Sequence, residues 1–374
     1  MAHTPTNVRS TQSVHSMAAP TRRLVVGLGG LAVCAALALP RGAAAQGRCG
    51  GDRAGTPACD TTPAKAPFAP TGWKTVALDH FSMRAADYKK ETAYYSALMN
   101  WTVKSDDGTQ AVLDAGTVGQ VVIRGGYQAP PPPPPPTAAD SAAGRARLAR
   151  PPRNVVWDSF CWVIAPWNAK KVEAALRERG LNPVADNDGA GFESFHVKDP
   201  DGFDVQISNG VHRPARATSA TASAPAPAPF EKTAWKTVWL DHISFGVTNY
   251  KESAAFYQAL LGWTSTGDEG SQSELWIGDV GNIIVRGGNP NAPGATPPAV
   301  RRAQMDHVSF GITPWDTDAV KAELDRRGLT GRADTGGKGD IHDPAALYKS
   351  YHTTTPNGFD LQISNATKTN RTVR

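Results

Sequence analysis

The fold of this chain is decided by a stretch that occurs twice. The later copy, residues 235–263, reads WKTVWLDHISFGVTNYKESAAFYQALLGW, and the earlier copy, residues 73–101, reads WKTVALDHFSMRAADYKKETAYYSALMNW. The copies align without a gap, so that His80 falls on His242 and Trp101 on Trp263. Each copy predicts a strand that carries the Asp-His pair, followed by a helix with apolar residues three to four positions apart. Because internal repeats indicate repeated structural units, this duplication sets the architecture.

A second pattern also occurs twice, after each copy of the first. Residues 158–181 match residues 306–329, and both contain a Pro-Trp pair and an Arg-Gly-Leu helix end. We expect strands at 155–164 and 306–312, and helices at 169–179 and 317–327, each stopped by a glycine. The further expected strands are 111–115, 120–124, 192–197, 203–208, 274–277, 282–286, 348–354 and 359–364. The chain is thus four strand–helix–strands units, and a unit of about fifty residues buries too little surface to fold alone, so the units should pair into two domains.

Composition predicts the limits of these domains. The chain of 374 residues contains 30 Pro and 36 Gly, which concentrate in a few connecting stretches. The expected organisation is an export signal (1–45), a disordered lead-in (46–70), an N-terminal domain (71–210), an Ala/Pro/Ser linker (211–232) and a C-terminal domain (233–366). Seven consecutive prolines, Pro130–Pro136, must run extended and cannot join a sheet.

The first 45 residues have the pattern of an export signal. Arg22-Arg23 precede an apolar run from Leu24 to Leu39, and three alanines at 43–45 form a small-residue cleavage site. The arginine pair favours the twin-arginine route, so we expect a periplasmic or extracellular protein. A retained membrane anchor is the alternative reading of the same run.

The net charge limits which partners the protein can have, and the cysteines predict one disulfide. The formal net charge of +5 includes four arginines within residues 1–45, and without them 35 basic face 34 acidic residues, a charge of +1. This balance gives no electrostatic footprint for nucleic acid or, after signal removal, for a membrane. A small-molecule partner is expected, and a homo-oligomer remains open. In an exported protein, Cys49 and Cys59 favour a short-loop disulfide, whereas Cys161 lies on an apolar strand and is expected in the core.

The four units resemble those of a known superfamily. A His lies on the first strand of the third and fourth units, at His242 and His307, and the motif P-x-G-x-x-x-Q precedes the end of the chain at Pro356–Gln362. These features resemble the vicinal oxygen chelate superfamily of glyoxalases, bleomycin-resistance proteins and extradiol dioxygenases. The resemblance implies an α+β fold in which four βαβββ units pair into two domains. In each domain a curved sheet forms a cup that can hold a divalent metal.

The same resemblance implies a metal site in the C-terminal domain. The ligand positions fall on His242, His307 and Gln362, while the fourth position falls on Val285, which cannot bind metal. Fe(II) is the expected ion, with Zn, Ni and Mn as alternatives. The competing interpretation is that both histidines are hydrogen-bonded core residues of a former site that no longer binds metal.

The corresponding site of the N-terminal domain is interpreted as degenerate. His80 and Gln206 occupy two ligand positions there. Ser159 replaces the second histidine, and Ile123 is apolar.

Several further residues are candidates for substrate chemistry. His352 is a candidate acid or base and Tyr351 a catalytic candidate, while Arg286 and Tyr348 are candidate substrate contacts. Packing or surface solvation is the alternative for each. Strand alternation predicts that the aspartate preceding each ligand, Asp241 or Asp306, points away from its own histidine.

These features predict an exported enzyme of the extradiol ring-cleaving dioxygenase type that acts on a small catechol-like substrate with vicinal oxygens. The alternatives are a glyoxalase-type lyase or isomerase, and a non-catalytic protein that binds or sequesters a small molecule. Gln362 in place of a carboxylate and His352 in place of a tyrosine depart from the extradiol signature. An insertion at 335–350, with Asp340 and His342, is a candidate lid or a plain surface loop.

Overall fold

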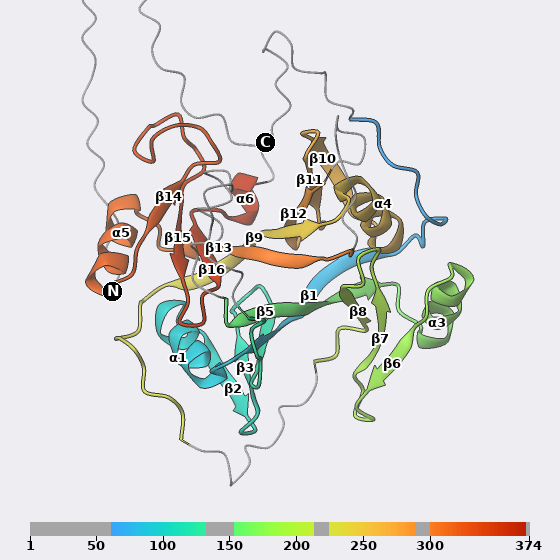
Figure 1. Ribbon diagram of the computed structural model, residues 1–374, viewed down its shortest axis with the longest axis horizontal. Coiled ribbons are helices and arrows are strands. Elements are labelled where there is room, and N and C mark those ends of the chain that lie inside the picture. Colours follow the sequence, from blue (N-terminus) through green and yellow to red (C-terminus); the bar gives the residue numbers. More distant parts are fainter. Residues whose placement is uncertain (1–60, 132–152, 213–223, 289–299, 372–374) are drawn as a thin grey trace, which may run out of the picture. The chain divides into compact units, whose positions relative to one another are not determined.

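The computed structural model describes residues 61–131, 153–212, 224–288 and 300–371 (Figure 1). The predicted export signal and the Cys49–Cys59 pair lie outside these residues, as do most of the proline run and part of the linker. Among the described residues, none of the helices has the length and apolar character needed to cross a membrane.

The N-terminal domain is built on one eight-stranded sheet. In sheet order its strands are β2 (Thr102–Asp106), β3 (Gln110–Asp114), β4 (Gln120–Arg124), β1 (Lys74–Ala85), β5 (Val155–Ala165), β8 (Asp204–Ser208), β7 (Glu193–Lys198) and β6 (Val184–Asn187). β1 pairs with β4 in parallel and with β5 antiparallel, so the first strands of two units meet at the sheet centre. The helices are α1 (Tyr88–Leu98) and α3 (Ala169–Glu178).

The C-terminal domain repeats this arrangement. In sheet order its strands are β10 (Thr264–Asp268), β11 (Gln272–Trp276), β12 (Gly281–Gly287), β9 (Lys236–Val247), β13 (Gln304–Thr313), β16 (Asp360–Ser364), β15 (Ser350–Thr354) and β14 (Arg332–Asp334). Its helices are α4 (Tyr250–Leu261), α5 (Thr317–Arg326) and the short α6 (Lys368–Arg371). The predicted α+β fold of four βαβββ units, paired into two domains, is confirmed.

The sequence did not predict the four edge strands, β2, β6, β10 and β14. These strands are polar and largely exposed, and in β10 four of the five residues are exposed. Because an exposed strand buries neither face, it lacks the alternation of apolar residues on which strand prediction depends.

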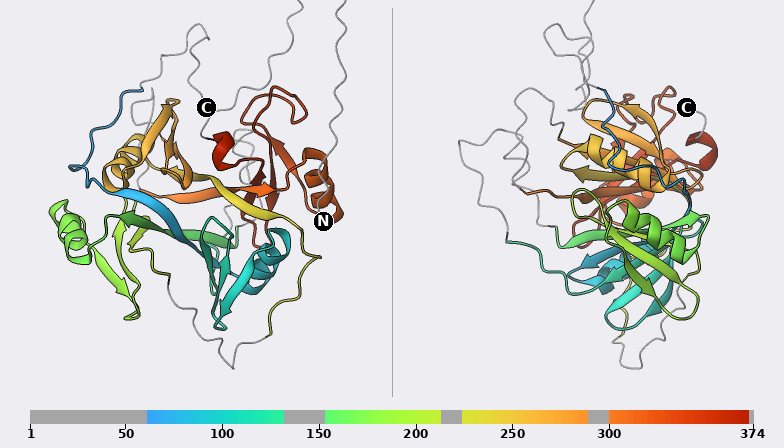
Figure 2. Two further views of the ribbon diagram at one scale, coloured as in Figure 1. Left: turned by 180° about the vertical axis from the view of Figure 1, so that it is seen from behind. Right: turned by 90° about the vertical axis from the view of Figure 1, so that its right-hand side faces the viewer.

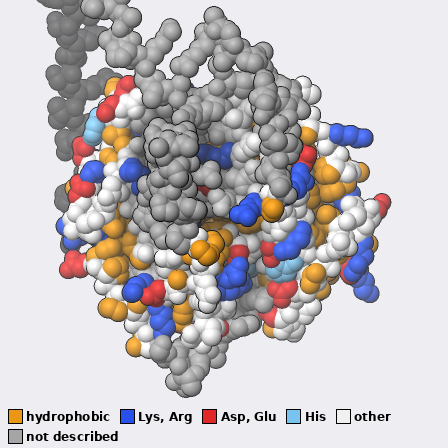
Figure 3. Space-filling view, in the orientation of Figure 1, with side chains coloured by type: hydrophobic (Ala, Val, Ile, Leu, Met, Phe, Trp, Pro, Cys, Tyr) orange, Lys and Arg blue, Asp and Glu red, His pale blue; other side chains and the backbone are white. Residues whose placement is uncertain are grey.

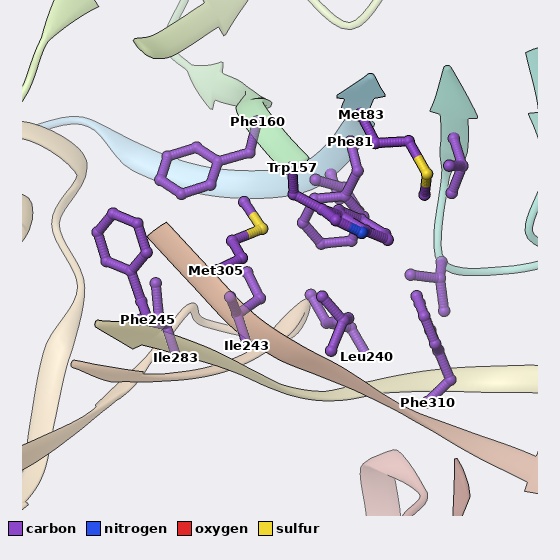
Figure 4. Packing of buried hydrophobic residues seen from close by; sticks show 14 of the residues in the cluster. Phe81, Met83, Trp157, Phe160, Leu240, Ile243, Phe245, Ile283, Met305 and Phe310 are labelled. Atoms are coloured by element: carbon purple, nitrogen blue, oxygen red, sulfur yellow. The ribbon is translucent and has the colours of Figure 1, made fainter. Parts of the chain in front are cut away.

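One apolar core lies between the two sheets, and all described residues belong to one compact unit (Figure 4). Side chains of β1 and β5 point toward side chains of β9 and β13, which lie beside them in all views (Figures 1 and 2). The ring centroids of Phe81 and Phe310 are 6.5 Å apart, and those of Phe160 and Phe245 are 6.0 Å apart. The opposite face of each sheet is therefore left to carry polar chemistry.

The tryptophan that ends each repeat contacts the other domain. Trp101 Nε1 donates a hydrogen bond to Thr237 Oγ1 at 2.8 Å, and Trp263 Nε1 donates to Thr75 Oγ1 at 2.9 Å. All four groups are buried. The two contacts are related by the duplication, because residue 75 matches 237 and residue 101 matches 263. We call them the reciprocal Trp–Thr contacts.

The P-x-G turn of each domain packs on the first helix of the other. Tyr257 of α4 donates from its hydroxyl to Asp199 Oδ2 at 3.0 Å, and Asn357 Nδ2 donates to Glu91 Oε2 of α1 at 2.8 Å. Burial raises the pKa of Asp199 to about 6, against the hydrogen bonds from Phe203 N and Tyr257 that lower it. Burial also raises the pKa of Glu91. Two carboxyl groups thus lie buried at the junction of the domains.

On the face of the molecule shown in Figure 3, Lys and Arg side chains are interspersed with Asp and Glu. This mixture agrees with the near-balance of charge in the chain after residue 45.

Candidate metal centre

A β-bulge at Asp241 shapes the site. On β9, Leu240 and His242 pair with the consecutive residues Phe310 and Ser309 of β13, so Asp241 is an extra residue in this strand. A bulge of this kind breaks the strict alternation of side chains along a strand. Close approach of β12 depends on Gly281, where a Cβ atom would lie 2.3 Å from the Leu240 carbonyl oxygen.

The bulge places Asp241 beside its own histidine. Asp241 Oδ2 lies 3.4 Å from His242 Nδ1, and on β1 of the other domain Asp79 Oδ1 lies 2.6 Å from His80 Nδ1. The expectation from alternation is therefore wrong for Asp241. For Asp306 the structure gives no contact of this kind, and its Oδ1 accepts a hydrogen bond from Gln304 Nε2 at 3.3 Å.

Strand register aligns the candidate ligands on one face of the C-terminal sheet. His242, Ser309, Gln362 and His352 are neighbours across β9, β13, β16 and β15. His307 lies two residues before Ser309 and thus on the same face. Its Nε2 atom is 3.1 Å from His242 Nε2. Two nitrogens bound to one ion at about 2.1 Å are separated by roughly 3.3 Å, so the histidine pair fits a shared metal.

Gln362 supplies an oxygen to the same face. The side chain is fully buried, and its Nε2 donates to Ser350 Oγ at 2.7 Å and to Tyr348 Oη at 3.0 Å. Its Oε1 atom accepts no hydrogen bond from any described residue. A buried acceptor without a donor is costly unless something else satisfies it, and a cation does so. The residues present therefore fit a metal held by two imidazoles and one amide oxygen.

Burial lowers the pKa of His307 well below its usual value, and the charges of His242, His352 and Arg286 act in the same direction, opposed by Asp241. His307 is therefore neutral near pH 7. Neutral imidazole is the form that binds metals.

Tyr348 and Asp241 link the two sides of the site. Tyr348 donates from its hydroxyl to Asp241 Oδ2 at 2.8 Å while it accepts from Gln362 Nε2, and Ser309 Oγ donates to the same Asp241 oxygen at 2.8 Å. Burial raises the pKa of Tyr348 well above its ordinary value, so the hydroxyl stays protonated. Tyr348 was predicted as a substrate contact, and the structure places it here as a bridge that positions Gln362.

His352 lies next to His307, with ring centroids 5.0 Å apart. Its Nδ1 is 3.0 Å from Asp360 Oδ1, and its Nε2 is 3.4 Å from Asp334 Oδ2. Burial opposes the charged imidazolium, but the hydrogen bonds and charges of Asp334 and Asp360 outweigh it and raise the pKa of His352. One ligand atom from each of His307, His352 and Asp360 lies within 4.8 Å of the others. Asp360 Oδ1 is already engaged by His352 and by Arg332, whose Nη2 donates to it at 3.0 Å.

Sequence reasoning missed Asp334 and Asp360, although a signal was present. In the N-terminal domain His196 has the same two partners, with Asp204 Oδ2 2.9 Å from Nδ1 and Asp186 Oδ2 3.4 Å from Nε2. The spacing from histidine to the later aspartate is the same in both domains. Comparison of the repeats beyond the first strand and helix would have found both partners.

Tyr351, the other predicted catalytic candidate, is not part of this cluster. It is 3% exposed, belongs to the apolar core, and stacks on Trp315 with centroids 6.3 Å apart. Because it neighbours His352 on β15, its side chain points to the opposite face.

The remaining candidates are placed as follows. Val285 is buried in the core, as its apolar side chain predicts. Arg286, next to it on β12, is partly buried, and burial lowers its pKa against the attraction of Asp306, Asp334 and Glu269. His342 is exposed, and its Nδ1 is 3.7 Å from Asp318 Oδ1.

The N-terminal sheet carries a cavity of about 570 Å³ on its corresponding face. Its lining includes Asp79, His80, Arg124, His196 and Gln206. Ile123, the apolar residue at a ligand position, lies in the core instead.

Cys161 is fully buried, as the sequence predicts. It does not belong to the apolar cluster between the sheets. Its partners in register are His80 on β1 and Gln206 on β8, whereas its neighbours Phe160 and Trp162 point into the core.

Two eight-stranded sheets of paired βαβββ units, with histidines on first strands and a P-x-G-x-x-x-Q motif on the last, define the vicinal oxygen chelate fold, and the chain has this fold. No protein-family model matches the sequence, and no curated protein matches it.

Solved structures with this fold resemble the chain over most of its length. The Mn(II)-bound glyoxalase from Novosphingobium aromaticivorans has a TM-score of 0.51 at 15% identity, covering 78% of this chain and 82% of that one. A 2,3-dioxygenase from Pseudomonas sp. KL28 has a TM-score of 0.51 at 14% identity, with coverages of 78% and 92%. Homoprotocatechuate 2,3-dioxygenase from Arthrobacter globiformis has a TM-score of 0.51 at 16% identity, with coverages of 81% and 83%.

Proposed function

We propose that this protein is a metal-dependent enzyme of the extradiol dioxygenase type that acts on a small catechol-like substrate. The observation that supports this most is the 3.1 Å separation of His242 Nε2 and His307 Nε2, on the sheet face that also carries the unpartnered Gln362 Oε1. Solved dioxygenase structures match 78% and 81% of the chain in fold. Fe(II) is the proposed ion, with Mn(II), Zn and Ni as alternatives, and the Mn(II)-bound glyoxalase shows that the fold accommodates a divalent ion.

In this proposal His242, His307 and Gln362 hold the ion, which when bound supplies Lewis acidity and coordination positions for two adjacent oxygens. Tyr348 keeps the Gln362 amide oriented through its hydrogen bond at 3.0 Å. The guanidinium of Arg286 attracts an anionic substrate to the same face.

His352 is the proposed proton donor and acceptor. Its contact to Asp334, at 3.4 Å, is longer than its contact to Asp360, at 3.0 Å. Nε2 is therefore the ring nitrogen more easily released to exchange a proton with a bound substrate, while Nδ1 stays anchored. The raised pKa keeps a larger share of His352 protonated near neutral pH than a free histidine has.

Elemental analysis tests the metal site. After anaerobic loading with Fe(II) and removal of excess ion, His242→Ala and His307→Ala should each lose one equivalent of iron relative to the parent chain. Tyr351→Phe is the matched control, because Tyr351 faces the core, and it should retain the iron. Equal iron content in all four proteins would remove the proposed site.

A glyoxalase-type lyase or isomerase is the second candidate, and Gln362 favours it. A neutral amide in place of a carboxylate leaves one more positive charge on the ion, which strengthens Lewis acidity without any need for oxygen. Oxygen consumption with catechols separates the two candidates. Uptake that depends on His307 supports the dioxygenase. Activity toward thiol adducts of oxo-aldehydes without oxygen uptake supports the glyoxalase, and tight substrate binding without turnover supports a binding protein.

We also propose export to the periplasm or beyond, from the sequence of residues 1–45. Replacement of Arg22 and Arg23 by Lys should retain the protein in the cytoplasm, as cell fractionation would show, whereas unchanged fractionation would refute a twin-arginine route.

A further inference from the structure

A second group of metal-binding side chains lies in the N-terminal domain. One ligand atom from each of Asp79, His80 and Cys161 lies within 4.8 Å of the other two. All three residues are at least nine-tenths buried, with exposures of 3%, 9% and 0%. Asp79 and His80 lie at the bulge of β1, and Cys161 is the partner of His80 on β5. Asp79 and His80 also line the cavity of about 570 Å³, so the group is connected to a space that a ligand can enter.

Comparison of the domains shows what is unusual in this group. Cys161 occupies the position of Ser309, since each is the partner of the first-strand histidine and of the last-strand glutamine. In the C-terminal domain the Ser309 hydroxyl donates to the aspartate of the bulge, Asp241, at 2.8 Å. In the N-terminal domain one oxygen of the matching carboxylate, Asp79 Oδ2, is buried and accepts no hydrogen bond from a described residue.

The buried oxygen that accepts no hydrogen bond points to a cation. Asp79 Oδ1 is held by His80 Nδ1 at 2.6 Å, which fixes the imidazole and leaves Oδ2 as an oxygen donor. Oδ2 also lies 3.3 Å from Nδ1 of the half-exposed His212. A buried carboxylate oxygen next to a thiol and an imidazole is a ligand set rather than an apolar core.

We propose that Asp79, His80 and Cys161 bind a second metal ion, a thiophilic divalent cation such as Zn²⁺. Thiolate and imidazole together select zinc-like ions over the hard cations that prefer oxygen. Ligand atoms around one such ion lie roughly 3–4 Å apart. The three ligand atoms here lie within 4.8 Å of one another, so small side-chain movements suffice to bring them to one ion. Binding releases the thiol proton of Cys161 to solvent and forms the metal–sulfur bond without any change of oxidation state.

This site is separate from the one proposed in the C-terminal domain, and it uses Cys161 where that domain has Ser309 rather than the degenerate position at Ser159. The complete burial of Cys161 disfavours the other use of a thiol beside a histidine, as an attacking nucleophile, which needs access to its substrate.

Cobalt(II) substitution tests the proposal, because a thiolate ligand to Co²⁺ gives charge-transfer absorption that oxygen and nitrogen ligands do not. The full chain is used with Cys34, Cys49 and Cys59 changed to Ser and with His242→Ala and His307→Ala, which leaves one thiol and removes the other site. Titration with Co²⁺ should give one equivalent bound with thiolate charge transfer. Zn²⁺ should then displace the cobalt and abolish the band.

Cys161→Ser is the matched variant, since it installs the residue of the other domain at nearly the same volume. It should abolish the charge-transfer band and weaken Co²⁺ binding by about 100-fold or more, and Asp79→Asn should weaken it by about 10- to 100-fold. Near-ultraviolet circular dichroism checks that each variant is folded. Cobalt binding by the parent without a thiolate band, absence of binding, or the same affinity in Cys161→Ser would each overturn the proposal. None of these results depends on the iron content or activity of the C-terminal site.

Discussion

A single amide decides the charge of the candidate metal centre. With His307 neutral and Gln362 uncharged, the three proposed ligands leave the full charge of a divalent ion in place. The nearest carboxylates stand behind the ligands instead. Asp334 Oδ2 accepts from Gln362 Nε2 at 3.3 Å, and Asp241 is bridged to the amide by Tyr348. The negative charges of the site thus contact the proposed ligand Gln362 and its partner Tyr348, and they are not themselves proposed ligands of the ion.

This arrangement predicts opposite effects of Gln362→Glu on metal binding and on stability. A carboxylate should hold Fe(II) more tightly, seen as slower loss to a chelator. Without metal it should destabilise the fold by roughly 1–3 kcal/mol, because the donor to Asp334 becomes a like charge. Thermal unfolding with and without metal measures the second effect.

Gln206→Glu is the matched control for that change. Gln206 Nε2 contacts Ser194 Oγ at 2.7 Å and Asp186 Oδ2 at 3.3 Å, which are the contacts of Gln362 in the other domain. It should lose similar stability and gain no retention of iron. If Gln362→Glu retains iron no better than the parent does, Gln362 is not a ligand.

At the scale of elements, the turn between β7 and β8 is coupled to α4 through a buried acid. Asp199 accepts from Tyr257 Oη and from Phe203 N, and burial raises its pKa from 3.8 to about 6. Since the folded-state pKa exceeds the unfolded value, the stabilising contribution of Asp199 is fully present below about pH 4 and is lost as pH rises through 6. The full shift corresponds to about 3 kcal/mol.

Asp199→Asn should therefore flatten the dependence of unfolding free energy on pH between 4 and 6, and should stabilise the protein at pH 7. Chemical denaturation at several pH values measures this. Tyr257→Phe removes a hydrogen bond that lowers the pKa of Asp199, so it should move the transition to higher pH. If the pH dependence is unchanged in Asp199→Asn, Asp199 is not a buried carboxyl group with a raised pKa.

At the scale of the whole molecule, the two domains share one core. The sheet faces that carry Phe81 and Phe310 bury each other, and the reciprocal Trp–Thr contacts join the helix end of each domain to the first strand of the other. Each domain alone would expose a large apolar face and two unpaired polar groups.

Separate expression of residues 61–212 and 224–371 should therefore give insoluble or unfolded chains, whereas coexpression should give a soluble complex. The parent chain should unfold in a single cooperative transition, measured by calorimetry. Trp101→Phe removes one reciprocal contact and should cost about 1 kcal/mol, and Trp263→Phe should cost a similar amount. Two resolved transitions, or a folded half, would contradict a shared core.

The sequence predicted the units, their pairing and the residues that meet at the candidate metal centre, because the repeats carry periodic apolar patterns and fixed motif spacings. It did not predict what depends on local departure from periodicity. The extra residue at Asp241 is invisible in a strand pattern, and the close approach at Gly281 that accompanies it appears only in the structure. Tyr351 was named together with His352 although neighbouring residues of a strand point to opposite faces.

The reciprocal Trp–Thr contacts also have an evolutionary consequence. After the gene segment doubled, a change at residue 75 affected the partner of residue 263, and a change at residue 237 affected the partner of residue 101. Selection on these contacts acts on both copies together, whereas the opposite face of each sheet is constrained only by its own ligand. The two copies should therefore stay most alike where the domains touch, as residues 73–101 and 235–263 do. They should diverge most on the opposite faces, where Cys161 of one domain matches Ser309 of the other.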